Sequence, residues 1–185
     1  MLVLASASPR RQELLRNAGI NFEVQPAHIP EDPMPGESAK ECAERLARGK
    51  ALTVARQRPQ DFVLGADTLV VVDGEILGKP SDAADAAHML HRLSGREHQV
   101  ITGVCLVVSG QCSVASETTS VTVSGISEKE IADYVASGEP MDKAGAYAIQ
   151  GIASRWIPRI EGDYSNVVGL PVALAWRMLR QAGLR

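Results

Sequence analysis

The sequence predicts an α/β fold built around a mixed β-sheet. Four runs of apolar, β-forming residues are typical of buried strands and lie at 2–4, 62–72, 98–108 and 112–123. Helix start signals separate some of these runs, whereas Asp73-Gly74 and Ser109-Gly110 are turn sequences that fold a strand back as a hairpin. Because hairpins make antiparallel pairs and helical crossovers make parallel ones, the sheet should be mixed.

Local signals place the individual elements. Serines followed by proline, or by glutamate three residues later, mark helix starts at Ser8, Ser38 and Ser127. Apolar spacing and glycine stops predict helices over 9–19, 38–58, 82–95, 127–136 and 172–181. Short strands are expected at 22–24 and 75–77, and residues 162–171 predict a turn into the last helix. The third helix should place Ala83, Ala86, Ala87 and Leu90 on one face.

Length and composition limit the classes of protein. A chain of 185 residues, 45% hydrophobic and 22% charged, predicts one globular domain over 1–185, with room for two small lobes whose boundary the sequence does not assign. The net charge of −3 argues against long nucleic acid as a partner but leaves small anions open. Three cysteines without a disulfide or zinc spacing, no leader and no membrane span predict a cytoplasmic protein.

The first candidate site lies where the first strand passes into a helix. Ser6, Ser8, Arg10 and Arg11 surround the expected helix N-terminus, whose free N–H groups and dipole favour an anion. Two arginines in a first turn oppose that dipole, so we expect phosphate oxygens to compensate their charge. The alternative is a plain serine cap with solvated arginines.

The second candidate site is a carboxylate inside an apolar strand. Asp67 follows Gly65-Ala66 and precedes Thr68 in the run 62–72, so it should be paired, metal-bound or functional. Lys50 falls on the inward stripe of its helix, where a lysine either extends its amine to the edge or reaches an anion site. Lys79 before Pro80 offers a second amine, and a solvated loop lysine is the alternative.

Two further groups suit a metal and a nucleobase. Glu31, Asp32 and Glu37, in a proline-rich loop, could join Asp67 as oxygen ligands of Mg²⁺ or Mn²⁺, although loop carboxylates are often only solvated. The amide of Gln150, in a glycine-punctuated stretch, has both a donor and an acceptor with which to recognise a base edge.

Taken together, five motifs resemble the Maf family of nucleoside triphosphate pyrophosphatases. They are, in order, Leu4-Ala5-Ser6-Ala7-Ser8-Pro9-Arg10-Arg11, Leu64-Gly65-Ala66-Asp67-Thr68, Gly78-Lys79-Pro80, Asp142 to Gly151, and Val168-Gly169-Leu170-Pro171. The resemblance implies an inosine-triphosphatase-like (Maf/Ham1) α/β fold, with an elongated mixed sheet and two lobes flanking a cleft. It also implies metal-dependent hydrolysis of a nucleoside triphosphate to the monophosphate and pyrophosphate.

The resemblance assigns roles to individual residues. Asp67 matches the family's proton acceptor, and Ser6, Arg10, Glu31, Lys50 and Lys79 match its phosphate and metal site. Arg11, Thr68 and Gln150 match the subfamily that acts on dTTP and UTP rather than on 7-methyl-GTP. The divalent cation is expected to be Mg²⁺, Mn²⁺ or Co²⁺, bound through Glu31 and Asp67, and the sequence leaves open whether Asp67 takes a proton or chiefly holds the metal.

One position departs from the family pattern and keeps an alternative open. The family commonly has an acidic residue before its helix lysine, and Gly49 stands there in this chain. The leading hypothesis is a house-cleaning enzyme for dTTP, UTP or modified pyrimidine nucleotides, linked to arrest of cell division. The alternative is a non-catalytic, nucleotide-binding regulator of division, in which Gly49 marks weakened metal binding. A homodimer is a further implication of the resemblance.

Overall fold

The computed structural model describes residues 1–184, and contacts within the chain divide them into two compact units. The first unit comprises residues 1–68, 102–117 and those from 169 onward, and the second comprises 69–101 and 118–168. Three long strands, β3 (Phe62–Val72), β5 (Glu97–Val108) and β6 (Gln111–Thr122), contribute residues to both units.

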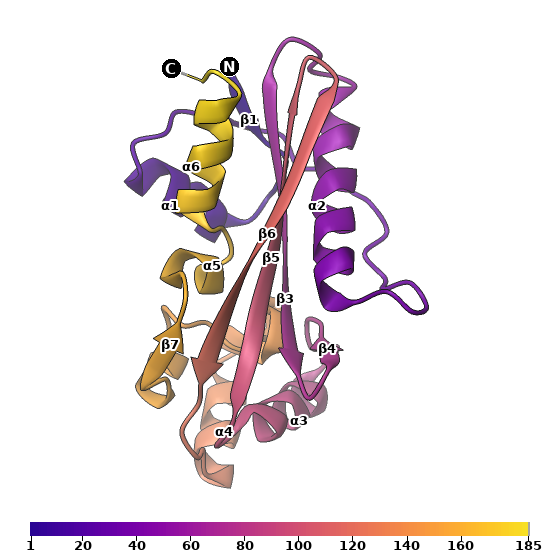
Figure 1. The fold of residues 1–185 in the computed structure, drawn as a ribbon. Coiled ribbons are helices and arrows are strands. Elements are labelled where there is room, and N and C mark those ends of the chain that lie inside the picture. The colour runs from indigo at the N-terminus through magenta and orange to yellow at the C-terminus, as the bar shows by residue number, and fades with distance from the viewer. Residues whose placement is uncertain (185) are drawn as a thin grey trace. The chain divides into compact units, whose positions relative to one another are not determined.

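In the first unit a sheet is packed between helices. Its other elements are β1 (Leu2–Leu4), α1 (Pro9–Asn17), β2 (Glu23–Val24), α2 (Ala39–Ala55) and α6 (Val172–Gln181). Alternation along β1 separates two cores: Leu2 and Leu4 pack with side chains of α1 and α6, and Val3 packs with side chains of α2. Figure 1 shows α1 and α6 on one side of the strands and α2 on the other.

The second unit combines hairpins, helices and short 3₁₀ turns. Its other elements are β4 (Glu75–Leu77), α3 (Ala83–Leu93), α4 (Glu128–Ala136), η1 (Glu139–Asp142), η2 (Ala144–Ala146), η3 (Ile152–Trp156), β7 (Arg159–Glu161) and α5 (Tyr164–Val168). Its core includes Leu90 and Leu93 of α3, Ile131 and Tyr134 of α4, and Trp156.

The sheet is mixed, as the sequence predicts. The strand order is β2-β1-β3-β5-β6-β7, with β4 paired to β3. β1 runs parallel to β2 and β3, whereas the pairs β3–β4 and β6–β7 are antiparallel. Among residues 1–184, no helix has both the length and the apolar composition needed to cross a membrane.

Local capping explains where the helices begin. Ser38 and Ser127 each accept a hydrogen bond from the backbone N–H three residues later, and the glutamate there bonds back to the serine N–H. Ser8 caps α1 with Pro9 at its first position. These three predicted starts are confirmed.

Some predicted details are wrong. The second helix ends at Ala55 rather than near Arg58. The stretch 162–171 is more than a turn, because it contains α5. A carboxylate oxygen of Asp163 accepts hydrogen bonds from the N–H groups of Ser165 and Asn166, which supports this short helix.

Candidate active site

Close packing of α2 on the sheet determines where Lys50 lies. A Cβ atom added to Gly65 of β3 would lie 2.3 Å from the Ala47 carbonyl oxygen and 2.8 Å from the Ala51 nitrogen. A Cβ atom added to Gly103 of β5 would likewise lie 2.3 Å from the carbonyl oxygen of Ala43. Glycine is needed at both positions because the helix backbone occupies the space of a side chain. The glycine at position 65 therefore allows the backbone of α2 to approach the strand closely.

Lys50 joins two carboxylates in the first unit. Its Nζ donates to Oδ1 of Asp67 at 2.6 Å and lies 2.6 Å from Oε1 of Glu31. Lys50 and Asp67 are only 8% and 7% exposed, whereas Glu31 is exposed. The buried carboxylate is therefore paired, as its apolar strand predicts, and the inward lysine is its partner.

Arg11 is a buried cation held by neutral acceptors. Its Nε donates to the Gly169 carbonyl at 2.7 Å, Nη1 to Ser6 Oγ at 3.2 Å and Nη2 to Thr68 Oγ1 at 3.0 Å. Burial lowers the pKa of Arg11, and the negative charge of Asp67 opposes that shift. A carbonyl and two hydroxyls fix the guanidinium, and none of these three acceptors cancels its charge.

Thr68 connects this arginine to Thr102, which no motif includes, and to Gly169, for which the sequence predicts no contact. Its Oγ1 lies 2.9 Å from Thr102 Oγ1 and donates to the Gly169 carbonyl at 3.1 Å. Thr102, a fully buried hydroxyl in the strand β5, was a readable signal, because a buried polar group needs a partner. The role of Gly169 comes from a backbone carbonyl, for which a sequence carries no signal.

The start of α1 has the arrangement expected of an anion site. Ser6 Oγ accepts from the backbone N–H of Ser8 at 3.2 Å as well as from Arg11. Arg10 is half-buried, and the first turn of α1 contains no acidic residue. Two cations at the positive end of a helix dipole favour a negatively charged ligand.

Of the three loop carboxylates, it is Glu31 that forms an ion pair with the Lys50 amine. Glu37 instead makes a two-point ion pair with Arg45, at 2.6 and 2.9 Å, and this guanidinium lowers the pKa of Glu37 to about 2. Asp32 offers its backbone carbonyl to Arg45 at 3.0 Å. Arg45 therefore fastens the loop to α2, which limits where Glu31 can lie.

Gly49 lies beneath this loop. A Cβ atom at this position would be 2.9 Å from Cδ1 of Ile29, so the isoleucine takes the place that a side chain at 49 would use. An acidic residue here would have to displace Ile29 first. The residue before Lys50 is thus part of the packing between the loop and α2.

The donor set around Lys50 suits a hard divalent cation. Glu31 and Asp67 offer carboxylate oxygens that meet at one positively charged atom, and Mg²⁺ is commonly held by one or two carboxylates together with substrate phosphates. Residues 1–184 contain no cluster of three or more His, Cys, Asp or Glu side chains that could hold a metal without a substrate.

Lys79 and Gln150 belong to the second unit, and both are exposed. The Gly78 carbonyl next to Lys79 accepts a hydrogen bond from the Gly145 N–H at 3.0 Å. Two motifs that are far apart in the sequence therefore meet within this unit. The roles of Lys79 and Gln150 as substrate ligands stay predictions.

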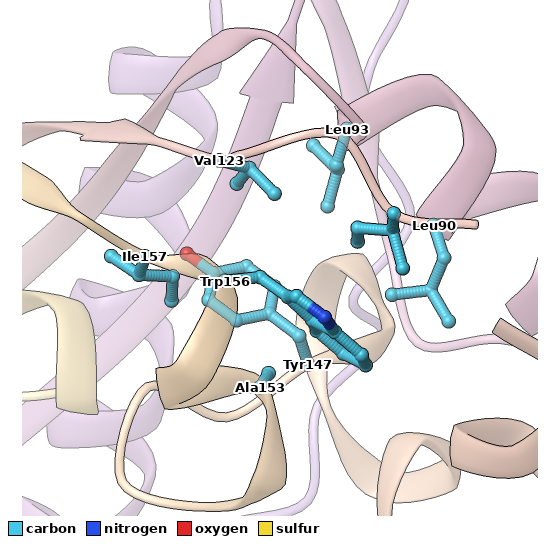
Figure 2. Close-up of a pocket in the computed structure, with 8 residues that line it drawn as sticks. Leu90, Leu93, Val123, Tyr147, Ala153, Trp156 and Ile157 are labelled. Atoms are coloured by element: carbon cyan, nitrogen blue, oxygen red, sulfur yellow. The ribbon is translucent and has the colours of Figure 1, made fainter. Parts of the chain in front are cut away.

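A separate apolar pocket in the second unit contains none of the predicted site residues. It is lined by Leu90, Leu93, Val123, Ile126, Tyr147, Ala153, Trp156 and Ile157. Figure 2 shows Val123, Leu93 and Leu90 on one side of it and Ile157, Trp156, Tyr147 and Ala153 on the other. Its lining residues carry no cationic group, so this pocket does not suit a triphosphate.

Comparison with known proteins gives the same family as the motifs. A profile described as "Maf-like protein" matches residues 1–182. The chain is 60% identical over 183 residues to a "dTTP/UTP pyrophosphatase" of Koribacter versatilis, covering 99% of this chain and 95% of the relative. It is 55% identical over 182 residues to a protein of the same name from Symbiobacterium thermophilum, covering 98% and 94%.

A solved structure confirms the expected fold. The Ham1 protein of Staphylococcus aureus matches with a TM-score of 0.55 over 98% of each chain, at 16% identity, so this likeness concerns the fold alone. The mixed α/β architecture agrees with the Maf/Ham1 fold that the motifs imply. With a family profile that matches almost its whole length, the chain belongs to the Maf family.

Proposed function

We propose that the protein is a nucleoside triphosphate pyrophosphatase that hydrolyses dTTP and UTP to the monophosphate and pyrophosphate. The observation that carries this proposal is the cluster in which the buried Lys50 joins Asp67 to Glu31 and the buried Arg11 is fixed beside Thr68. The names of the two relatives support these substrates. Modified pyrimidine nucleotides are compatible with the same chemistry.

The cluster supplies charge where a triphosphate needs it. A nucleoside triphosphate and the transition state for its cleavage carry several negative charges, so prepositioned cations lower the barrier. Arg11 is already held in one orientation by three hydrogen bonds and loses little freedom when a phosphate binds. Ser6 and Arg10, at the start of α1, would bind further phosphate oxygens.

Asp67 is the proposed proton acceptor for the attacking water, and Lys50 keeps its carboxylate in place. Glu31 and Asp67 would hold a divalent cation, Mg²⁺, Mn²⁺ or Co²⁺, which when bound supplies positive charge and makes a bound water more acidic. Lys79 is proposed as a further phosphate ligand, and Gln150 as a ligand of the nucleobase.

The test is release of pyrophosphate from dTTP, UTP, CTP, GTP, ATP and 7-methyl-GTP, with each divalent cation and with a chelator. We expect turnover of dTTP and UTP that requires the cation. Asp67→Asn should lower kcat by about 10²- to 10⁴-fold, the usual effect of losing a general base, with the Kd for nucleotide changed less than about tenfold. Nucleotide binding by the wild-type chain without pyrophosphate release would contradict the proposed enzymatic activity. A preference for purine nucleotides would support pyrophosphatase activity but contradict dTTP and UTP as the substrates.

A further inference from the structure

Gln150 occupies the exposed tip of a tight turn. The backbone N–H of Gly151 donates to the Ala148 carbonyl at 3.1 Å, which closes the turn 148–151. Ile149, the first central residue, is buried, and Gln150, the second, is exposed. The turn therefore anchors an apolar side chain and presents the glutamine amide to solvent.

One pair of side chains holds the backbone on both sides of that amide. The hydroxyl of Tyr134 accepts a hydrogen bond from the Ala148 N–H at 3.3 Å and donates to Oε1 of Glu139 at 2.8 Å. The Glu139 carboxylate in turn accepts from the Ile152 N–H, at 3.1 Å to Oε1 and 3.3 Å to Oε2. The turn is thus tied to α4 and η1 at its entry and at its exit.

Gly151 makes room for this attachment. A Cβ atom there would lie 2.2 Å from Oε1 and 2.7 Å from Oε2 of Glu139, so the carboxylate occupies the space of a side chain at 151. Burial, and then the bond to Glu139, raises the pKa of Tyr134, which keeps its hydroxyl proton available for that bond. The Tyr134 ring also packs edge to face on Trp156, 5.3 Å between ring centroids, which fixes the hydroxyl in space.

We infer that Tyr134 and Glu139 are positioning residues for Gln150 and thereby determine which nucleobase the enzyme accepts. This inference rests on the proposed function, in which the Gln150 amide contacts the base. The hydrogen bonds at Ala148 and Ile152 fix the backbone from which the Gln150 side chain extends, and a displaced backbone would move the amide away from the base edge that it distinguishes. Uracil and cytosine differ in the donors and acceptors along one edge. The ratio of kcat/KM for UTP to kcat/KM for CTP therefore reports how the Gln150 amide meets that edge.

The experiment compares kcat and KM for UTP and CTP in Tyr134→Phe, Glu139→Gln and Gln150→Ala, alone and as double variants. Tyr134→Phe keeps the ring that packs on Trp156 and removes only the hydroxyl. We expect the UTP preference to fall by about three- to tenfold in each single variant, within the range of one or two hydrogen bonds. The loss should appear in KM with kcat preserved, and the double variants with Gln150→Ala should show no further loss.

Controls separate positioning from simple support of the fold. Glu128→Gln removes one charge from an exposed side chain of the same helix, and Tyr164→Phe removes an exposed hydroxyl, so both should keep the UTP preference. If Tyr134→Phe or Glu139→Gln fails to fold, Gly151→Ala provides a second route, because its methyl group displaces the Glu139 carboxylate without changing Gln150.

Each outcome decides a different point. If Tyr134→Phe and Glu139→Gln lower the melting temperature but keep the wild-type ratio of kcat/KM for UTP and CTP, the inference is overturned and the proposed function is unaffected. A Gln150→Ala variant that keeps this ratio would also overturn the inference. If the wild-type chain turns over no nucleotide, the proposed function fails. The preference is then measured as the ratio of the Kd values for UTP and CTP. Equal effects of Tyr134→Phe and Gln150→Ala on that ratio would still support the positioning role.

Discussion

At the scale of single residues, the unusual feature is an amine buried between two carboxylates. Removing a buried partner leaves an uncompensated charge, which costs more than the ion pair itself contributes. Asp67 is as buried as Lys50, so Lys50 both stabilises the site and supplies it with positive charge. Replacing Lys50 by a neutral residue, alone and together with a neutral replacement of Asp67, separates the two contributions.

Lys50→Met should destabilise the protein by about 3 kcal/mol or more, because Asp67 then stays buried without its cation. The double variant Lys50→Met, Asp67→Asn should recover a large part of that loss, because neither residue is then charged. Urea unfolding of the wild-type chain, both single variants and the double variant measures this coupling. Additive losses would show that the pair contributes independently and would contradict the account.

At the scale of elements, α2 lies on two glycines of neighbouring strands, and this packing brings Lys50 to Asp67. Gly65→Ala should destabilise the first unit by about 1–3 kcal/mol, as overpacking does, because the backbone of α2 cannot move away as a flexible side chain would. It should also lower activity by displacing Lys50. Gly125→Ala is the matched control, because outside the adjacent residues no heavy atom lies within 4 Å of its added Cβ. Thermal unfolding of both variants checks the prediction, and equal melting temperatures would contradict it.

Elements with local signals were predictable, and those that depend on tertiary contacts were not. The helices that begin at Ser38 and Ser127 were predicted because the capping residues lie within four positions of one another. No strand is predicted at 159–161, where β7 forms by antiparallel pairing with β6. In the site, Asp67 stood out by its apolar strand, whereas the Gly169 carbonyl that holds Arg11 could emerge only from the fold.

At the scale of the whole molecule, one buried histidine connects pH to stability. His98 of β5 bonds through Nε2 to the Tyr147 hydroxyl at 2.7 Å, and its Nδ1 has no hydrogen-bond partner among residues 1–184. Burial lowers the pKa of His98 to about 4, from an ordinary value of 6.5. The strand β5 contributes residues to both units. In two-state unfolding, protonation of His98 therefore changes the free energy of unfolding of the entire chain.

The sign of the effect follows from proton binding. Between pH 6.5 and about 4 the unfolded chain binds a proton at this histidine and the folded chain does not, so the free energy of unfolding falls as pH falls through this window. The contribution of His98 is fully present above pH 6.5, and its loss amounts to at most about 3 kcal/mol by pH 4. His98→Gln, which keeps a polar group near Tyr147, should flatten the slope of stability against pH, and exposed His88→Gln should not. Urea unfolding between pH 4 and 8 measures the difference in free energy of unfolding between the wild-type chain and His98→Gln, in which the effects of their shared carboxylates cancel. Parallel curves of this free energy against pH would contradict the prediction, because they would show that His98 is protonated alike in the folded and unfolded states.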